Sequence, residues 1–482
     1  MLRFTLLLMV CLAVGSIGTA KVKAPRTKGS KPAPSASPSD ELKALASDYG
    51  IQLENLSIFA TTEGSKTPLL DINAMKTMTP ASVTKIITAS AVLDSFPPDY
   101  RFTTQLLGNS SKKGSIFIGD LYLKGGGDPS FGAEGMQTLV DTFAKLKITK
   151  VVGDIVVDDS LFDSSRYDVS REQARVDHAY DAPVGAMSFG LNTVSIWIRP
   201  TKSGKKADVT IEPETDYIRV VSKAKTVSGR KNRLTAERRH SKKSGDLILI
   251  NGVIGERYNP IFVEKNITQP DIWAGYNLKT FLAKKGIQVT GQIRNGLTAP
   301  NAKVLAEAKS KPIEEILIDM NKSSNNFVAE MLAKNLGTFL RPTGATLADG
   351  VRIINKHLKK IGLQDSEFKI TNPAGLTHEN KISSMAVWHI LCHLQEDPRA
   401  QKAFFNSLPI AGVDGTLKTR NIASTEGTWV RAKTGYIRNV TALAGYAQKK
   451  NGKMITFSFV YNGAIDDRKV AKFFDQLLVK LL

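Results

Sequence analysis

Strand-like and helix-like segments are unevenly distributed along the 482-residue chain. Residues 41–99 combine a strand (51–62) with an apolar helix, and helices dominate again from residue 299 before three strands and a last helix close the chain. Between them, residues 100–298 consist of short alternating segments divided by Gly, Asp, Asn and Pro, which is typical of β-strands. We therefore expect residues 41–99 and 299–482 to form one α/β domain. Residues 100–298 would be an inserted β-rich region of one or two accessory domains.

The N-terminus has the pattern of an export signal. Arg3 precedes a short apolar run, and small residues follow it up to Ala20, which predicts a signal peptide over residues 1–20. A buried helix is the alternative. Residues 21–40 are rich in proline, serine and lysine and predict a flexible basic linker. No later stretch is apolar for long enough to span a bilayer, so we expect an exported protein without a membrane span in its mature form. The periplasm is the expected location, and an extracellular or cell-wall-associated protein is the alternative.

The formal net charge of +21 restricts the expected partners. For an exported protein the available polyanions are wall polymers and lipid headgroups and not nucleic acid. The charge therefore predicts a loose, salt-sensitive association with anionic wall or membrane surfaces. The basic stretch from Lys223 to Lys243 is either a solvated face or a contact of this kind.

Ser82 and Lys85 form a candidate nucleophile and base. A serine hydroxyl is a weak nucleophile that needs an adjacent base, and residues at i and i+3 of a helix share one face. Ser82 opens a strongly apolar helix, whose N-terminus adds positive potential at the hydroxyl. The same spacing occurs at five other places, all in polar surroundings: Ser110/Lys113, Ser203/Lys206, Ser222/Lys225, Ser228/Lys231 and Ser366/Lys369.

No pattern in the chain predicts a metal or a cofactor. His389 and His393 have the i, i+4 spacing of a metal-binding helix, but no glutamate occupies the position that a metalloprotease needs. The six histidines stand in no recognisable serine-hydrolase motif, so a lysine base is the remaining option for Ser82.

Two further motifs follow in the last third of the chain. Lys433-Thr434-Gly435 lies within a strand, and Ser324 with Asn326 lies in a polar break between two helices. A register with Ser323 and Asn325 fits the second pattern equally well.

In this order, the three motifs resemble the active-site signature of penicillin-recognising serine enzymes: Ser-x-x-Lys, Ser-x-Asn and Lys-Thr-Gly. The 242 residues that separate Ser82 from Ser324 are similar to the spacing in class C low-molecular-mass penicillin-binding proteins, the D-alanyl-D-alanine carboxypeptidase/endopeptidase family. The resemblance implies an α/β (α+β) transpeptidase-like domain, an antiparallel sheet with helices on both faces, with inserted β-rich domains. It also favours Ser324 and Asn326 over the neighbouring register. Further stretches resemble the family at 119–131, 152–163, 180–200, 322–334 and 407–420.

One segment departs from the family pattern. Residues 372–380 correspond to a stretch usually written Asp-Gly-Ser-Gly-Leu-Ser-Arg-x-Asn, and Asn372, Pro373 and His378 replace its Asp, first Gly and Arg. The family role of this loop is therefore not transferred.

The resemblance implies a mechanism. Lys85 takes the proton of Ser82, which attacks the carbonyl of the penultimate D-alanine, and the backbone N–H groups of Ser82 and Tyr436 bind the oxyanion. Ser324 and Lys433 relay a proton to the leaving amine, and Lys433 helps to keep Lys85 neutral by like-charge repulsion.

The same resemblance implies the binding residues. Asn326 would hold the substrate amide, and Thr434, beside Gly435, the terminal carboxylate. Asp181 would bind an amine of the stem peptide or serve as a turn carboxylate.

The implied activity is a peptidoglycan DD-carboxypeptidase with DD-endopeptidase activity on cross-links. Its partners would be stem peptides and cross-links, with β-lactams as inhibitors that acylate Ser82. The alternatives are a serine β-lactamase and a catalytically idle wall-binding protein.

Overall fold

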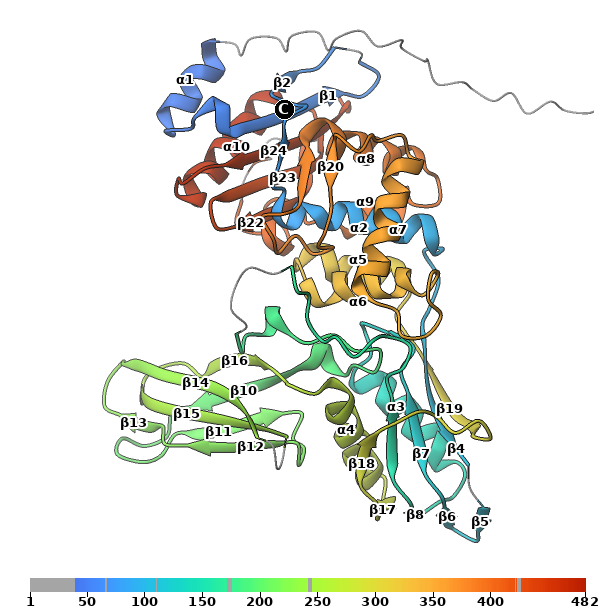
Figure 1. The fold of residues 1–482 in the computed structure, drawn as a ribbon. Helices are drawn as coiled ribbons and strands as arrows, with labels where there is room; N and C mark the ends of the chain where they lie inside the picture. The colour runs from blue at the N-terminus through green and yellow to red at the C-terminus, as the bar shows by residue number, and fades with distance from the viewer. Residues whose placement is uncertain are drawn as a thin grey trace, which may run out of the picture.

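The computed structural model describes residues 40–482 except 66, 110, 171–175, 242–244, 421 and 423–425. The predicted signal peptide and the predicted linker, apart from Asp40, lie outside these residues. Two bodies are visible: an upper one built from both ends of the chain and a lower one built from its middle (Figure 1).

The upper body is organised around a five-stranded antiparallel sheet in the order β2-β1-β24-β23-β22. β1 pairs with β24 from Leu56 opposite Tyr461 to Thr62 opposite Ile455, so the two ends of the chain meet in one sheet. Its strands are β1 (Leu56–Thr62), β2 (Leu70–Ile72), β22 (Trp429–Ile437), β23 (Val440–Gln448) and β24 (Met454–Asn462).

Helices cover both faces of this sheet. Along β23, Leu443 and Ala447 face one core, while Ala442, Ala444 and Tyr446 face the other. The first core is closed by α1 (Asp40–Asp48) and α10 (Asp467–Leu481). The second contains the remaining helices: α2 (Thr84–Ser95), α5 (Ile313–Lys322), α6 (Asn326–Gly337), α7 (Leu347–Lys360), α8 (Ser384–Glu396) and α9 (Gln401–Ser407). The predicted antiparallel sheet with helices on both faces is confirmed. A small sheet of β3 (Thr77–Met78), β20 (Phe368–Lys369) and β21 (Lys381–Ser383) lies beside it.

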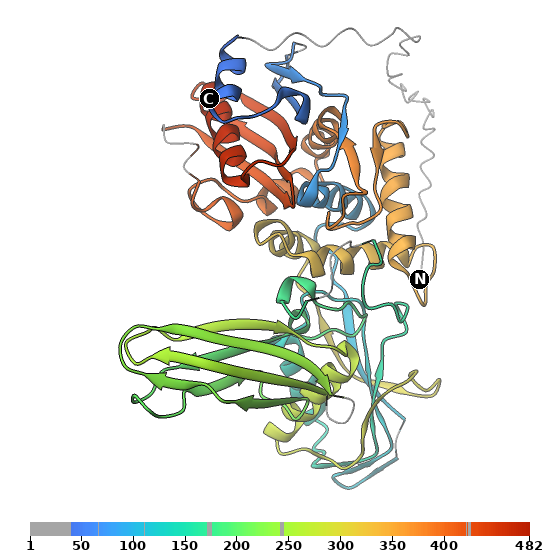
Figure 2. The same cartoon turned by 60° about the vertical axis from the view of Figure 1, so that its left-hand side comes forward.

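The lower body divides into two lobes, seen from a second side in Figure 2. The first lobe has two sheets with α3 (Ala133–Ala144) and α4 (Pro270–Lys284). Its strands are β4 (Thr103–Gly108), β5 (Ser111–Lys113), β6 (Ile116–Ile118), β7 (Leu121–Lys124), β8 (Lys150–Val152), β9 (Ile155–Asp158), β17 (Gln288–Val289), β18 (Ile293–Asn295) and β19 (Lys303–Lys309). The second lobe has β10 (Thr193–Arg199), β11 (Asp208–Glu212), β12 (Ile218–Ser222), β13 (Lys225–Val227), β14 (Asn232–Ser241), β15 (Gly245–Gly255) and β16 (Ile261–Asn266).

The β-rich region ends later in the structure than the sequence predicts. β19 pairs antiparallel with β4, the first strand of the lower body, before α5 begins at Ile313. Residues 303–309 therefore belong to the inserted sheet and not to the domain that was expected to resume at residue 299.

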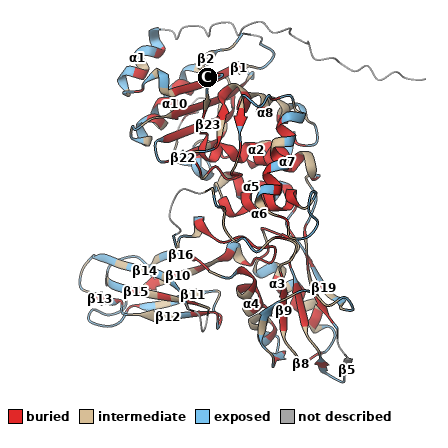
Figure 3. Ribbon diagram, viewed as in Figure 1, coloured by how far each residue is buried: buried red, intermediate tan, exposed pale blue. Residues whose placement is uncertain are grey.

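The central helix of the upper body is α2, which is buried on every side (Figure 3). Residues 84–93 are all buried, and they include the polar side chains of Thr84, Lys85, Thr88 and Ser90 as well as apolar ones. Any polar side chain on its first turn is therefore held in a site of low dielectric constant. Among the described residues, no helix is long and apolar enough to cross a membrane.

Candidate active site

Ser82 lies in a short 3-10 turn, Ala81–Val83, that runs directly into α2. The residue is 8% exposed, so Ser82 is buried apart from a small accessible part. Ala81 has a φ of +47°, which is strained for a residue with a Cβ. The strained turn is held from outside by Gly375, where an added Cβ would lie 1.9 Å from the carbonyl oxygen of Ala81.

Lys85 is fully buried one turn further along. Its Nζ atom lies 3.1 Å from the Ser82 Oγ atom, 2.8 Å from Asn326 Oδ1 and 2.7 Å from the Ala374 carbonyl oxygen. The last two atoms only accept hydrogen bonds, so each requires one N–H of the lysine. A neutral amine has two N–H bonds and one lone pair, and its lone pair then faces the Ser82 hydroxyl. This arrangement suits proton abstraction by Lys85.

Ser324 and Lys433 form a second polar pair in the same site. The Lys433 Nζ atom donates to Ser324 Oγ at 2.8 Å and to the Thr434 carbonyl at 2.8 Å. The Lys433 side chain is fully buried, and burial lowers its pKa to about 7. A lysine with this pKa exchanges a proton with a hydroxyl far more readily than an exposed lysine does.

Of the two residue pairs that fit the second motif, Ser324 and Asn326 are the pair that contacts the two lysines. Ser324 reaches Lys433 with a φ of +55°, and Asn326 reaches Lys85 from the start of α6. Ser323 instead donates to the Asp319 carbonyl, and Asn325 caps α6 by accepting the Val328 N–H at 3.1 Å. These neighbours therefore serve the helix ends.

β22 carries the third motif to the edge of the site. A Cβ added to Gly435 would lie 2.6 Å from the Pro80 carbonyl, so only glycine lets this strand approach the Ser82 turn. Thr434 donates its hydroxyl to Thr416 Oγ1 at 2.8 Å. The next residue, Tyr436, is 60% exposed at the rim.

Asp181 lies on the lower-body side of the site. Asn326 donates through Nδ2 to the carbonyl of Tyr180 at 3.3 Å, which places the 3-10 turn Ala179–Asp181 against the site. The Asp181 carboxylate is 4% exposed and accepts the Val176 N–H at 2.9 Å. The Asp181 backbone carbonyl also accepts a hydrogen bond from Asn266 Nδ2 at 2.7 Å, so the residue is tied to the end of β16 (Ile261–Asn266) as well as to its own loop.

Two groups in this site were missed by sequence reasoning. The Ala374 carbonyl contacts Lys85, and the Thr416 hydroxyl contacts Thr434. Every residue has a backbone carbonyl, so the sequence could not indicate the contact that Ala374 makes. Thr416 lies within 407–420, a stretch already marked by the family resemblance, and that was the available signal.

The loop that departs from the family pattern lies directly behind Lys85. Asn372 and Asn380 are both fully buried, and Asn380 donates to the Asn372 carbonyl at 2.7 Å and to Thr84 Oγ1 at 3.2 Å. His378, which replaces the family arginine, contacts the Arg438 carbonyl at 2.9 Å through Nε2. Through Ala374 and Asn380 the loop therefore contacts Lys85 and Thr84 on the first turn of α2.

The described residues contain no group of three or more His, Cys, Asp or Glu side chains placed to hold a metal ion. His389, one of the two histidines with metal-binding spacing, contacts the Ile361 carbonyl at 2.8 Å through Nε2.

Comparison with known proteins adds the family. The model of the D-Ala-D-Ala carboxypeptidase 3 (S13) family matches residues 39–481. A D-alanyl-D-alanine carboxypeptidase of Actinomadura sp. (strain R39) is 28% identical over 439 residues, which cover 88% of this chain and 80% of that protein. The D-alanyl-D-alanine carboxypeptidase DacB of Haemophilus influenzae is 23% identical over 412 residues, 85% of each chain. The crystal structure of penicillin-binding protein 4 (dacB) from H. influenzae matches with a TM-score of 0.77 and 21% identity, covering 91% of this chain and 99% of that one.

Proposed function

Because the chain belongs to the D-Ala-D-Ala carboxypeptidase 3 (S13) family, we propose that it hydrolyses D-alanyl-D-alanine termini of peptidoglycan through an acyl-enzyme on Ser82. The enzyme class is a serine-type D-Ala-D-Ala carboxypeptidase, a hydrolase. The observation that carries the role of Ser82 is the 3.1 Å separation of its hydroxyl from the Lys85 amine, whose two N–H bonds face Asn326 and Ala374.

Acylation begins with proton transfer from Ser82 to neutral Lys85. Ser82 Oγ then attacks the carbonyl carbon of the penultimate D-alanine, and the backbone N–H groups of Ser82 and Tyr436 stabilise the oxyanion. In this scheme Lys85 acts in its neutral form, with its two N–H bonds donated to Asn326 and the Ala374 carbonyl.

Departure of the leaving D-alanine requires a proton on its amine. Ser324 lies between the substrate and Lys433 in the proposed relay, and its 2.8 Å contact with Lys433 supports the transfer. Water then hydrolyses the ester on Ser82, which restores the hydroxyl and releases the shortened stem peptide.

The substrate is held by groups around this centre. We assign the Thr434 hydroxyl to the terminal carboxylate, Asn326 to the substrate amide and Asp181 to an amine of the stem peptide. The hydrogen bond from Thr434 to Thr416 supports the first assignment, because it fixes the threonine rotamer. The same groups accept the D-alanine of a cross-link, which extends the proposed activity to DD-endopeptidase cleavage.

β-Lactams are proposed inhibitors of the same serine. A second structure of the H. influenzae penicillin-binding protein 4 is a complex with a novel β-lactam, and it matches this chain with a TM-score of 0.71 and 21% identity. Attack of Ser82 Oγ on a β-lactam carbonyl opens the ring and leaves an acyl-enzyme without a leaving group that can diffuse away.

The proposed setting is the exported side of the cell, with the periplasm as the location. Exposed basic residues on and around β13, which lies at the far end of the second lobe (Figure 1), support association with anionic wall or membrane surfaces. Lys206 and Lys225 are bridged neighbours there, and Lys202, Lys205, Arg230, Lys231 and Arg233 are also exposed. Binding to isolated sacculi should weaken steeply with salt, since exposed charges are screened at about 10 Å in 0.1 M salt.

Release of D-alanine tests this function. The wild-type chain should release D-alanine from a stem pentapeptide and cleave a purified D-Ala cross-linked dimer. The Ser82→Ala chain should do neither while melting at the wild-type temperature. A Ser82→Ala chain that releases D-alanine at the wild-type rate would refute the assignment.

A further inference from the structure

The direction of the Ala374 carbonyl decides which way the Lys85 lone pair points. That carbonyl accepts one N–H of Lys85 at 2.7 Å, and Asn326 accepts the other at 2.8 Å. A rotated Ala374 peptide would free one N–H to compete for Ser82 and turn the lone pair away from the hydroxyl.

Asn372 holds that peptide. Its Oδ1 atom accepts three successive backbone N–H groups, from Ala374 at 2.9 Å, Gly375 at 2.7 Å and Leu376 at 3.0 Å. The Ala374 carbonyl and the Gly375 N–H belong to one planar trans peptide and point in opposite directions. The bond from Gly375 to Asn372 therefore aims the Ala374 carbonyl at Lys85.

This support works in only one orientation of the Asn372 amide. A flipped amide would put its NH₂ group against three N–H donors, which cannot accept a hydrogen bond. The opposite end of the amide selects the orientation: Asn372 Nδ2 donates to Asp168 Oδ2. The Asp168 carboxylate is itself fixed by the Ser170 N–H at 2.9 Å and the Ser170 hydroxyl at 2.7 Å.

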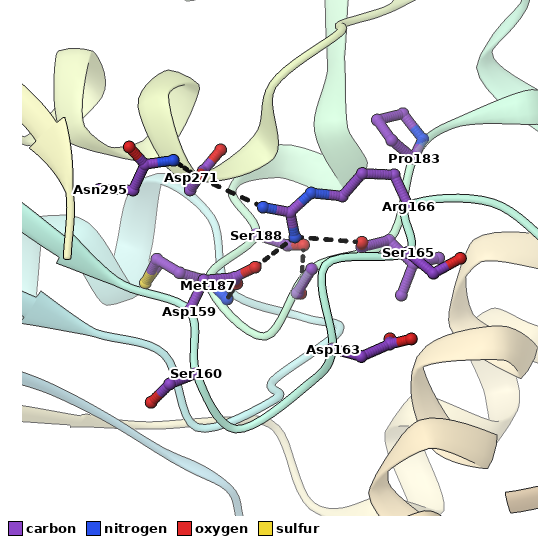
Figure 4. A network of polar contacts seen from close by, with 12 residues as sticks. Asp159, Ser160, Asp163, Ser165, Arg166, Pro183, Met187, Ser188, Asp271 and Asn295 are labelled. Atoms are coloured by element: carbon purple, nitrogen blue, oxygen red, sulfur yellow. Dashed lines mark hydrogen bonds and ion pairs between the residues drawn. The ribbon is translucent and has the colours of Figure 1, made fainter. Parts of the chain in front are cut away.

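Asp168 belongs to a segment that joins the two bodies, residues 159–170. In this bridging segment, Arg166 lies between Asp159 and Asp271, so the segment is tied to the lower body (Figure 4). Asn295 donates to Asp271 at 3.0 Å and extends the same network.

The bridging segment is also tied to the upper body. Lys334 of α6 binds Asp163 and the Ser165 carbonyl, and the backbone of Asp163 donates to Ala345 at 3.1 Å. Asp168 and Thr371 both line a cavity of about 360 Å³, together with Asp163, Arg166 and Lys334. The segment therefore holds Asp168 against Asn372 from fixed points on both bodies.

We propose that Asp168 is a positioning residue for the catalytic base: through Asn372 and the Ala374 carbonyl, the inserted region orients Lys85 toward Ser82. The inference rests on the proposed role of Ser82 and Lys85, and it assigns the inserted region a part in catalysis.

The decisive comparison uses the rate of acylation by a fluorescent penicillin in the full chain. Asp168→Ala removes the acceptor of the Asn372 NH₂ group, and acylation should slow by about tenfold or more, as expected for a partial loss of general-base catalysis. The concentration of penicillin that half-saturates the rate should change little, because Asp168 has no proposed contact with the ligand. Ser170→Ala is the matched control: it removes a bond to the same carboxylate but keeps the Asn372 contact, and it should acylate at the wild-type rate.

Rescue separates positioning from folding. In Asp168→Ala/Asn372→Asp, a carboxylate replaces the amide at position 372. Both of its oxygens accept hydrogen bonds, so either orientation satisfies the three N–H groups and no partner at position 168 is needed to select one. Acylation should therefore return to within a few-fold of wild type. The exchange Asp168→Asn/Asn372→Asp keeps the hydrogen bond of the pair, now donated from position 168 to position 372, with the charge moved, and it should also remain near wild type. If Asp168→Ala does not fold, the rate of acylation of this exchange variant tests the inference.

Three results would overturn the inference: wild-type acylation by Asp168→Ala, a double variant as slow as the single one, or a folded exchange variant slowed more than tenfold. A wild-type chain that is not acylated at Ser82 would instead refute the proposed function, so the two failures are distinguishable.

Discussion

The Lys433 amine lies 2.8 Å from the Ser324 hydroxyl, and Lys433 is fully buried. This pair places a lysine whose pKa burial lowers to about 7 within hydrogen-bond distance of the Ser324 hydroxyl. The neighbouring Ser323 differs from Ser324 by one position and contacts the Asp319 carbonyl instead. The two serines therefore allow a controlled test of the relay.

Ser324→Ala should lower kcat for D-alanine release about a hundredfold or more, because it interrupts proton transfer to the leaving amine. Ser323→Ala should leave kcat within about twofold of wild type, since an exposed hydroxyl bonded to a helix carbonyl contributes little. Steady-state kinetics on a stem pentapeptide checks both. Equal losses in the two variants would mean that the relay does not run through Ser324.

The pKa of about 7 at Lys433 predicts a pH dependence of acylation. Burial disfavours the charged amine, so Lys433 loses its proton as the pH rises through about 7. The proposed relay donates that proton, and kcat/KM for the peptide should therefore fall above this pH. In Lys433→Arg the descending limb should move far to the alkaline side, because arginine stays protonated. If the descending limb of kcat/KM stays near pH 7 in Lys433→Arg, Lys433 is not the proton donor of the relay.

Thr434→Val tests recognition of the terminal carboxylate. A hydrogen bond to a charged group is worth about 1.5–3 kcal/mol, so kcat/KM for a peptide with a free carboxylate should fall roughly 10- to 100-fold. Thr416→Val removes only the partner that orients Thr434, and its loss should be a few-fold. Neither substitution should lower kcat/KM for a C-terminally amidated peptide to the same extent, because that peptide lacks the charge. A loss of equal size on the amidated peptide would contradict the assignment.

Arg166→Met tests the network that ties the bridging segment to the lower body. Arg166 lies between the buried carboxylates of Asp159 and Asp271, and burial raises the pKa of Asp159 to about 6 despite this partner. Its removal leaves two uncompensated buried carboxyl groups and should lower the free energy of unfolding by roughly 3–5 kcal/mol.

Arg294→Met is the matched control for that variant. Arg294 also contacts two aspartates, Asp120 and Asp154, but its side chain is 48% exposed. Its loss should cost about 1 kcal/mol or less. Denaturant unfolding of both variants measures the two losses in the free energy of unfolding. Equal losses would show that burial does not increase the contribution of the Arg166 network to stability.

Local sequence patterns predicted the elements with strong periodicity. The apolar helix behind Ser82, the final three strands and the last helix are present as α2, β22 to β24 and α10. The end of the inserted sheet was misjudged because residues 303–309 alternate weakly, and their strand exists only through pairing with β4, far away in sequence. Such a strand forms because of long-range pairing, which its own residues do not indicate.

The candidate site shows the same division. Side chains in motifs (Ser82, Lys85, Ser324, Asn326 and Lys433) could be predicted from spacing and family resemblance, and the structure brings them together. The Ala374 carbonyl could not, since any residue supplies one. Asp168 meets Asn372 across 204 positions of sequence, and nothing in either segment indicates the other.

Mass spectrometry of the penicillin adduct tests the central claim most directly. After incubation with a fluorescent penicillin and proteolysis, the label should be on the peptide that contains Ser82. It should be absent from Ser82→Ala and strongly reduced in Lys85→Ala. Label on a different residue, or none in a folded wild-type chain, would contradict an acyl-enzyme on Ser82.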